Sequence, residues 1–158
     1  MNRVAAAFVA LGMNFDTGIT VSNGGLNAPL ADMAKYLIFL TAEGPTAVDG
    51  AVLMRSSLEE MWKPQLPAAD GEGATGSSAQ VGLSFFLERP DGADLVAHSG
   101  DQNGFISHLY VHRPSRTAYV ASFNTDVAAS KTHSGRPTTR QVDAAVRDAI
   151  VREIFARR

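Results

Sequence analysis

The sequence predicts an α+β fold, in which an antiparallel β-sheet meander is flanked by helices and a C-terminal helix packs on the sheet. Three observations carry this prediction. Apolar residues recur with a helical period over residues 29–43, alternate with a period of two within residues 81–124, and return to a helical period after residue 139. Short connections between the predicted strands favour antiparallel pairing. The 158 residues suit one domain, so we assign residues 1–158 to a single domain.

The first element is a helix predicted from Pro29 to Glu43. Residues spaced three or four apart form one face: Leu30, Met33, Ala34, Leu37 and Thr41. Pro29 suits a first helical turn, where its missing N–H would have no partner, and Gly44-Pro45 ends the helix. A second, short helix is predicted from Ser57 to Trp62, because Ser56-x-x-Glu59 has the spacing of a capping box.

The middle of the chain predicts a loop and then strands. Residues 66–80 (LPAADGEGATGSSAQ) are rich in Gly, Ala and Ser, and this composition predicts a flexible surface loop. From Val81 to Leu87 apolar residues alternate, as in one half-buried strand. Pro90-Asp91-Gly92 then predicts a turn.

Three further strands are predicted from Asp94 to Ser99, from Phe105 to His112 and from Thr117 to Asn124. The loop Gly100–Gly104 joins the first two, and the tight turn Arg113–Arg116 joins the last two. The final helix is predicted from Thr139 to Ala156, and its start is capped by Thr138-x-x-Gln141. One apolar stripe along it is expected to face the sheet: Val142, Val146, Ala149, Ile150, Ile154 and Phe155.

Composition excludes several classes of function. The formal net charge of −2 argues against a nucleic-acid partner. The chain has no cysteine, which excludes disulfides, thiolate zinc sites and thiol nucleophiles. No apolar run is long enough to span a membrane, and the run Val4–Leu11 favours an ordinary core element over a signal peptide. Gly71–Gly76 lacks the Gly-Lys-Ser/Thr of a phosphate loop, so we predict no cofactor and no metal site.

The histidines offer no metal site of their own. His108 and His112 share one face of a strand, but four residues at roughly 3.3 Å each separate them by about 13 Å, too far to share one ion. We therefore interpret both as solvated strand residues. His133 lies in a polar stretch with no evident partner.

One segment does suggest chemistry. The strand Val96-Ala97-His98-Ser99-Gly100 is followed by a glycine-containing loop and by Phe105. Small side chains at Ser99 and Gly100 let a ligand approach the strand backbone and its N–H groups. The alternative interpretation, a plain hairpin with a polar loop, is favoured when these residues are considered alone.

A family resemblance adds to this picture. Segments in the same order as in the family resemble the C-terminal part of the serine β-lactamase and penicillin-binding-protein superfamily, in its class C and esterase-like branch. They are Gly24-Gly25-Leu26 with Asp32–Leu37, Val52-Leu53 with Glu60-Met61 and Pro64-Gln65, Val81–Phe85, His98-Ser99-Gly100 with Gly104-Phe105, and Phe123-Asn124-Thr125. Together they cover about residues 24–126. The resemblance implies a partial β-lactamase/transpeptidase-like fold.

It also implies a site. His98, Ser99 and Gly100 would border the substrate, with His98 in place of the usual lysine, and the backbone N–H of Asp101 would form half of an oxyanion hole. The family's nucleophile motif Ser-x-x-Lys and its Tyr-x-Asn motif are both absent. We therefore expect the C-terminal fragment of a β-lactamase-related serine hydrolase, which acts on an ester, amide or β-lactam and is inactive alone.

Two alternatives to this function stay open. The first is a non-catalytic module that binds a peptide or small acyl ligand with the same pocket wall, and the second is an unrelated fold. In the family the first strands of the sheet come from the part that precedes this match, so the strands here would leave an open edge. We therefore expect a homo-oligomer, aggregation or a complementing N-terminal part.

Overall fold

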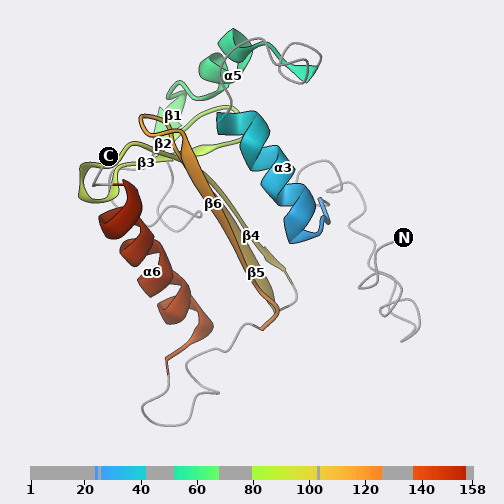
Figure 1. The fold of residues 1–158 in the computed structure, drawn as a ribbon, viewed down its shortest axis with the longest axis vertical. Helices are drawn as coiled ribbons and strands as arrows, with labels where there is room; N and C mark the ends of the chain where they lie inside the picture. Colours follow the sequence, from blue (N-terminus) through green and yellow to red (C-terminus); the bar gives the residue numbers. More distant parts are fainter. Residues whose placement is uncertain are drawn as a thin grey trace.

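The computed structural model describes residue 24 and residues 26–41, 52–67, 80–102, 104–125 and 137–155. Six strands form one antiparallel sheet in which each strand pairs with its neighbours along the chain (Figure 1). They are β1 (Leu66–Pro67), β2 (Gln80–Val81), β3 (Phe86–Glu88), β4 (Leu95–Gln102), β5 (Phe105–His112) and β6 (Thr117–Phe123). The α+β class and the antiparallel meander are therefore confirmed.

The long strands β4, β5 and β6 form the body of the sheet. β5 and β6 match their predicted ranges closely, but the predicted loop at residues 100–104 is wrong because β4 continues to Gln102. Gln102 pairs with Phe105, so the connection has only two residues, and Gly104 adopts a φ of 79° there.

The strand predicted from Val81 to Leu87 is in fact two strands. β2 and β3 pair as a hairpin, with Val81 opposite Phe86, and the four residues between them form the turn. The N–H of Gly82 donates to the carbonyl of Phe85 at 2.8 Å, and Ser84 takes a φ of 63°. The predicted loop at residues 66–80 begins and ends in strands β1 and β2, and its residues 68–79 lie outside the described residues.

The helix α3 (Leu30–Thr41) covers one face of the sheet over β6 and β5. This helix was predicted, but its apolar face is only partly as expected. Leu37 is buried, whereas Leu30 and Ala34 are exposed and Leu40, which was not expected on that face, is fully buried. The core on this side of the sheet joins α3, α5 (Arg55–Met61), the β2–β3 turn and the sheet through buried side chains: Leu37, Leu40, Leu58, Trp62, Phe85, Val96, Leu109 and Val111. Burial of these apolar side chains is the main stabilising contribution on this face.

The short helix α5 begins earlier than predicted, and its predicted capping box does not form. Met54 occupies the N-cap position without a side-chain hydrogen bond. Glu59 pairs instead with Arg55 at 2.9 Å. The guanidinium of Arg55 also donates to the carbonyl of Leu40 at 2.8 Å, which ties α5 to the end of α3.

The C-terminal helix α6 (Thr139–Ile150) continues into a π-helical turn, η4 (Val151–Phe155), and lies on the opposite face of the sheet. Its predicted capping box is present: Thr138 accepts from the N–H of Gln141, whose side chain accepts from the N–H of Thr138. A second core gathers buried side chains from the η2 turn (Pro90–Gly92) region, β4, β5 and η4: Ala93, Leu95, Ala97, Tyr110, Val151 and Phe155.

The apolar stripe predicted for this helix is partly wrong. Val142, Val146 and Ile154 are exposed, while Phe155 and Val151 are buried against the sheet. Polar side chains occupy part of the sheet-facing surface, because Asp143 and Arg147 are only 21% and 12% exposed. No described helix is long and apolar enough to cross a membrane.

Candidate functional site

The predicted site strand is exposed along part of one edge. β3 pairs with β4 only from Leu95 to Ala97, whereas β4 continues for five more residues, from His98 to Gln102. Along those five residues the edge of β4 that faces away from β5 has no strand partner among the described residues. Backbone N–H and C=O groups at such an edge are available to a ligand.

The four predicted site residues lie on both faces of β4. His98 and Gly100 share the face covered by α3, and Ser99 and Asp101 share the face covered by α6, because side chains alternate along a strand. His98, Gly100 and Asp101 are exposed and Ser99 is half-buried. The ring of His98 lies 6.0 Å from that of Phe86 on β3.

Gly100 has a close neighbour on the next strand. A Cβ built there would lie 3.3 Å from the hydroxyl oxygen of Ser107, its cross-strand partner on β5. The Ser107 hydroxyl therefore occupies part of the space beside Gly100, and it would have to shift to admit a Cβ. His98, Gly100 and Asp101 are nevertheless exposed, so the strand is accessible at these positions.

The carboxylate of Asp101 is held by a residue that the sequence did not single out. Arg140, in the first turn of α6, forms an ion pair with it. Because both side chains are largely exposed, this pair contributes little to stability, but it fixes the direction of the carboxylate on the α6 side of the sheet. The charge of Asp101 is thereby balanced on the face opposite His98 and Gly100.

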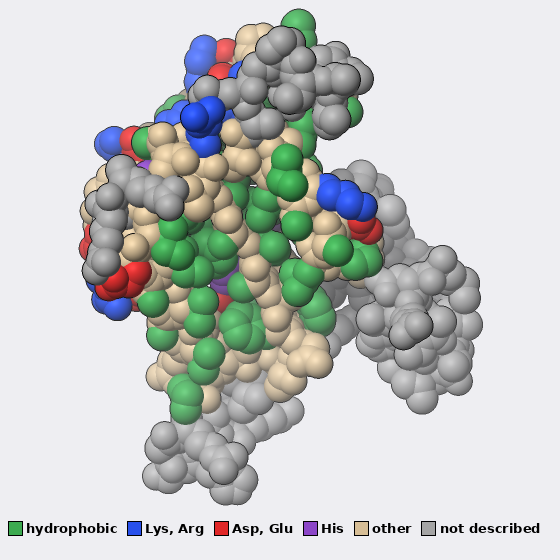
Figure 2. Space-filling model, in the orientation of Figure 1, with side chains coloured by type: hydrophobic (Ala, Val, Ile, Leu, Met, Phe, Trp, Pro, Cys, Tyr) green, Lys and Arg blue, Asp and Glu red, His purple; other side chains and the backbone are tan. Residues whose placement is uncertain are grey.

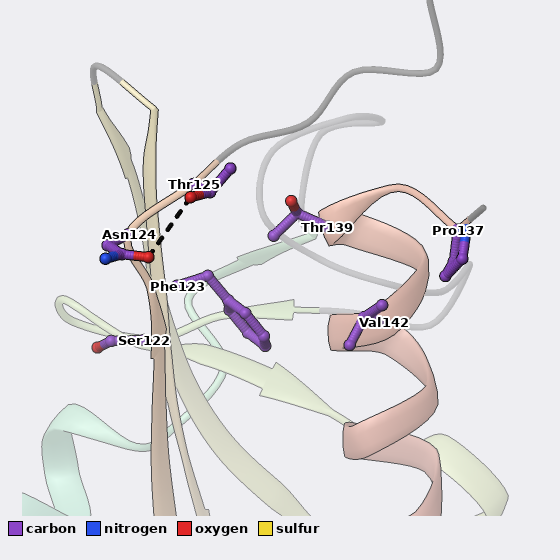
Figure 3. Close-up of a pocket in the computed structure, with 7 residues that line it drawn as sticks. All are labelled: Ser122, Phe123, Asn124, Thr125, Pro137, Thr139 and Val142. Carbon is purple, nitrogen blue, oxygen red and sulfur yellow. Dashed lines mark hydrogen bonds between the residues drawn. The ribbon is translucent and has the colours of Figure 1, made fainter. Parts of the chain in front are cut away.

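A pocket of about 270 Å³ lies two strands away from β4, between the end of β6 and the start of α6 (Figure 3). Its lining residues are Ser122, Phe123, Asn124, Thr125, Pro137, Thr139 and Val142. Phe123 points from the strand toward Val142 on the helix. The pocket does not include His98, Ser99, Gly100 or Asp101, so the predicted site strand and the pocket are separate features.

The expectation for His108 and His112 is wrong, because both are buried, at 6% and 5% exposure. Nδ1 of His108 lies 2.9 Å from the Asp143 carboxylate on α6. Nδ1 of His112 lies 2.6 Å from the Ser115 hydroxyl, and its ring stacks on Phe155 with centroids 5.2 Å apart. Strand alternation placed the two histidines on one face correctly, but could not show that a helix covers that face.

Aromatic and charged side chains surround His108. Tyr110 and Tyr119 lie edge-on to its ring, with centroids 5.2 and 5.4 Å away. Burial lowers the pKa of His108, although the Asp143 carboxylate opposes that effect. Burial also lowers the pKa of His112 and raises that of the Tyr119 hydroxyl.

Sequence reasoning missed Arg140, Asp143 and the buried environment of the two histidines. Their common signal is charged residues three or four apart on α6, at positions 140, 143 and 147, beside the apolar stripe. Among the described residues no group of three His, Asp or Glu is placed to hold a metal ion. Gly71–Gly76 and His133 lie outside the described residues.

Comparison with known proteins finds no match: no family model fits the chain, and no curated protein or solved structure is similar to it.

Proposed function

We propose that β4 is the substrate-binding strand of an acyl-transfer site, and that the chain is the C-terminal part of a serine hydrolase related to β-lactamases. The observation that carries this proposal is the edge of β4 from His98 to Gln102, which no strand pairs in the part of the chain that the structure describes. A carbonyl or carboxylate that lies along this edge would accept hydrogen bonds from strand N–H groups, which are preorganised. The resemblance of His98-Ser99-Gly100 to the family's motif supports the same location.

In this proposal each residue has a separate role. The N–H of Asp101 donates to the developing oxyanion, and His98 lies beside the acyl group. Gly100 is exposed and has no side chain that would block the ligand. The Asp101 carboxylate does not oppose the oxyanion, because Arg140 holds it on the other face. The attacking serine would come from outside these 158 residues, since none of the serines here has a lysine three residues later.

The partners follow from the same proposal. The ligand is a small acyl compound (an ester, a peptide or a β-lactam). The outer edge of β6 would take either a complementing N-terminal part or a second copy of the chain.

The test separates binding from turnover. The purified chain is mixed with a chromogenic cephalosporin and with a p-nitrophenyl ester, and we expect no turnover of either. It is then titrated with benzylpenicilloate, the ring-opened acyl product, and backbone amides are followed by NMR. We expect shifts at residues 98–101, and His98→Ala to weaken binding by about threefold to tenfold, the loss of one polar contact.

Lys35→Ala is the matched control, since Lys35 is an exposed side chain on α3 whose ion pair with Asp32 lies on the surface. It should bind as the wild-type chain does. Shifts confined to the pocket between β6 and α6, or no shifts at all, would refute the proposal. Turnover by the chain alone would refute the proposal that the attacking serine comes from outside these 158 residues. The last arm adds the complementing N-terminal part that would carry the serine. If the chain then still binds benzylpenicilloate saturably but turns over neither substrate, the non-catalytic binding module is favoured.

A further inference from the structure

Two buried histidines on β5 lie beneath the two ends of the C-terminal helical segment. His108 faces Asp143 in the first half of α6, and His112 stacks on Phe155 at the end of η4. The histidines are about 13 Å apart along the strand. The contact between this helical segment and the sheet therefore includes a titratable ring near each end.

A second proton on the His108 ring would have no hydrogen-bond acceptor among the described residues. Nδ1 faces the Asp143 carboxylate, which favours the neutral ring with its proton on Nδ1. Nε2 is buried and has no hydrogen-bond partner among the described residues. Protonation would place an N–H donor at Nε2 without an acceptor, and a buried donor without a partner is unfavourable.

Charged and titratable groups face His108 from each element packed against it. α6 contributes Asp143, which favours the protonated ring, and Arg147, which opposes it. Tyr110 and Tyr119 contribute neutral rings, and Ser99 lies opposite His108 on β4. Glu88 on β3 acts on Tyr119. Burial outweighs the attraction of Asp143, so the pKa of His108 is lowered.

His112 has a similar balance. Asp94, just before β4, favours the protonated ring, but burial outweighs it and the pKa is lowered. Its neighbours are the Ser115 hydroxyl in the β5–β6 turn and Phe155 in η4. Protonation would place a positive charge on a ring that is buried against Phe155, and a buried charge is unfavourable because it has lost its contact with water.

We propose that His108 and His112 make the docking of α6 and η4 on the sheet depend on pH: neutral rings hold the helical segment, and protonation releases it. A histidine with a lower pKa in the folded than in the unfolded state binds its proton more tightly after release. Docking is therefore strongest above the ordinary histidine pKa of about 6.5, and it weakens as the pH falls through the lowered values.

Release of α6 also affects the site strand. Arg140 lies one helical turn before Asp143 and pairs with Asp101, so a released helix would leave the Asp101 carboxylate without its partner. This second consequence rests on the proposed function, whereas release of the helix does not.

Hydrogen–deuterium exchange tests the release. Exchange of peptides from residues 139–155 is measured between about pH 7.5 and about pH 5, corrected for intrinsic rates, with α3 as the internal reference. In the wild-type chain we expect protection of the helical segment to fall by about tenfold or more relative to α3. His108→Gln with His112→Gln should abolish that fall, because glutamine does not titrate. His98→Gln, which changes an exposed histidine, should keep it.

Equal protection at all pH values in the wild-type chain would overturn the proposal, as would an unchanged fall in the double variant. Should the double variant fail to fold, ring titration by NMR in the wild-type chain decides. Two histidine rings must titrate below about 6.5, and titration of the buried rings at or above that value overturns the proposal. Benzylpenicilloate binding is measured in parallel. Helix release without ligand binding at any pH refutes the proposed function alone.

Discussion

Gly82 shows how one residue joins two elements. A Cβ at this position would lie 2.3 Å from the carbonyl oxygen of Met61, the last residue of α5. The same carbonyl accepts the N–H of Leu83 at 2.8 Å. The β2–β3 turn therefore lies directly on the backbone at the end of α5, and only glycine leaves room for that contact.

We predict that Gly82→Ala destabilises the chain by about 2 kcal/mol or more, because backbone rather than a flexible side chain must move to accept the methyl group. Urea unfolding followed by the fluorescence of Trp62 measures this change. Gly24→Ala is the control, since a Cβ at Gly24 meets nothing within 4 Å. Equal unfolding midpoints for the two variants would show that the turn does not depend on this contact.

The burial of His108 and His112 is a property that the local sequence could not predict. His108 and His112 were placed on one strand face by alternation, but their burial depends on the position of α6, which the strand sequence does not encode. His98 lies on the same sheet but on the face opposite α6, and it stays exposed. Local sequence therefore predicted the faces of these side chains, whereas tertiary packing decided their solvation.

At the scale of elements, long periodic segments were predicted well and short ones were not. α3, β5, β6 and α6 each span seven or more residues. The pair β2 and β3 has five residues in total, and a turn interrupts them without breaking the alternation of apolar residues. β4 was predicted too short, because glycine and polar residues in its second half are typical of a loop.

The start of α6 offers a test of an element predicted correctly. We predict that Thr138→Ala destabilises the chain by about 1 kcal/mol, because the N–H of Gln141 loses its acceptor. Thr138→Ser keeps the hydroxyl and should change stability by only a few tenths of a kcal/mol. Thermal unfolding monitored by circular dichroism compares the two variants. A serine variant as unstable as the alanine variant would mean that the hydroxyl is not the cause.

At the scale of the whole molecule, the outer edge of β6 has no strand partner among the described residues. β6 is the last strand of the sheet. Its sequence, TAYVASF, contains no charged residue and no proline, the features that usually protect an edge. Figure 2 shows apolar side chains gathered along β6 between α6 and α3. Val142 and Val146 on α6 are among the exposed apolar residues.

We predict that the isolated chain self-associates, because an unprotected strand edge pairs readily with another chain. Ser122→Lys places a charge on β6 and should reduce the associated fraction, whereas Ser122→Ala should not. Light scattering after size-exclusion chromatography measures both variants and the wild-type chain. A monodisperse wild-type monomer with sharp cooperative melting would contradict the prediction.

The fold class and most of the long elements could thus be predicted from periodicity, and the candidate strand from its small residues. The contacts that surround the candidate strand could not. The pairing of Asp101 with Arg140 joins residues that are 39 positions apart, and the limited length of β3 exposes the edge of β4. Both depend on how the elements meet, which no local pattern contains.

The order of strands in the sheet has a consequence for how the chain acquires its structure. Each strand pairs with its neighbours along the chain, and the long strands β4, β5 and β6 are joined by connections of only two and four residues. Short loops close quickly and at low entropic cost. During synthesis β4 and β5 leave the ribosome before β6, and the helical segment that packs on the sheet is made only after all six strands.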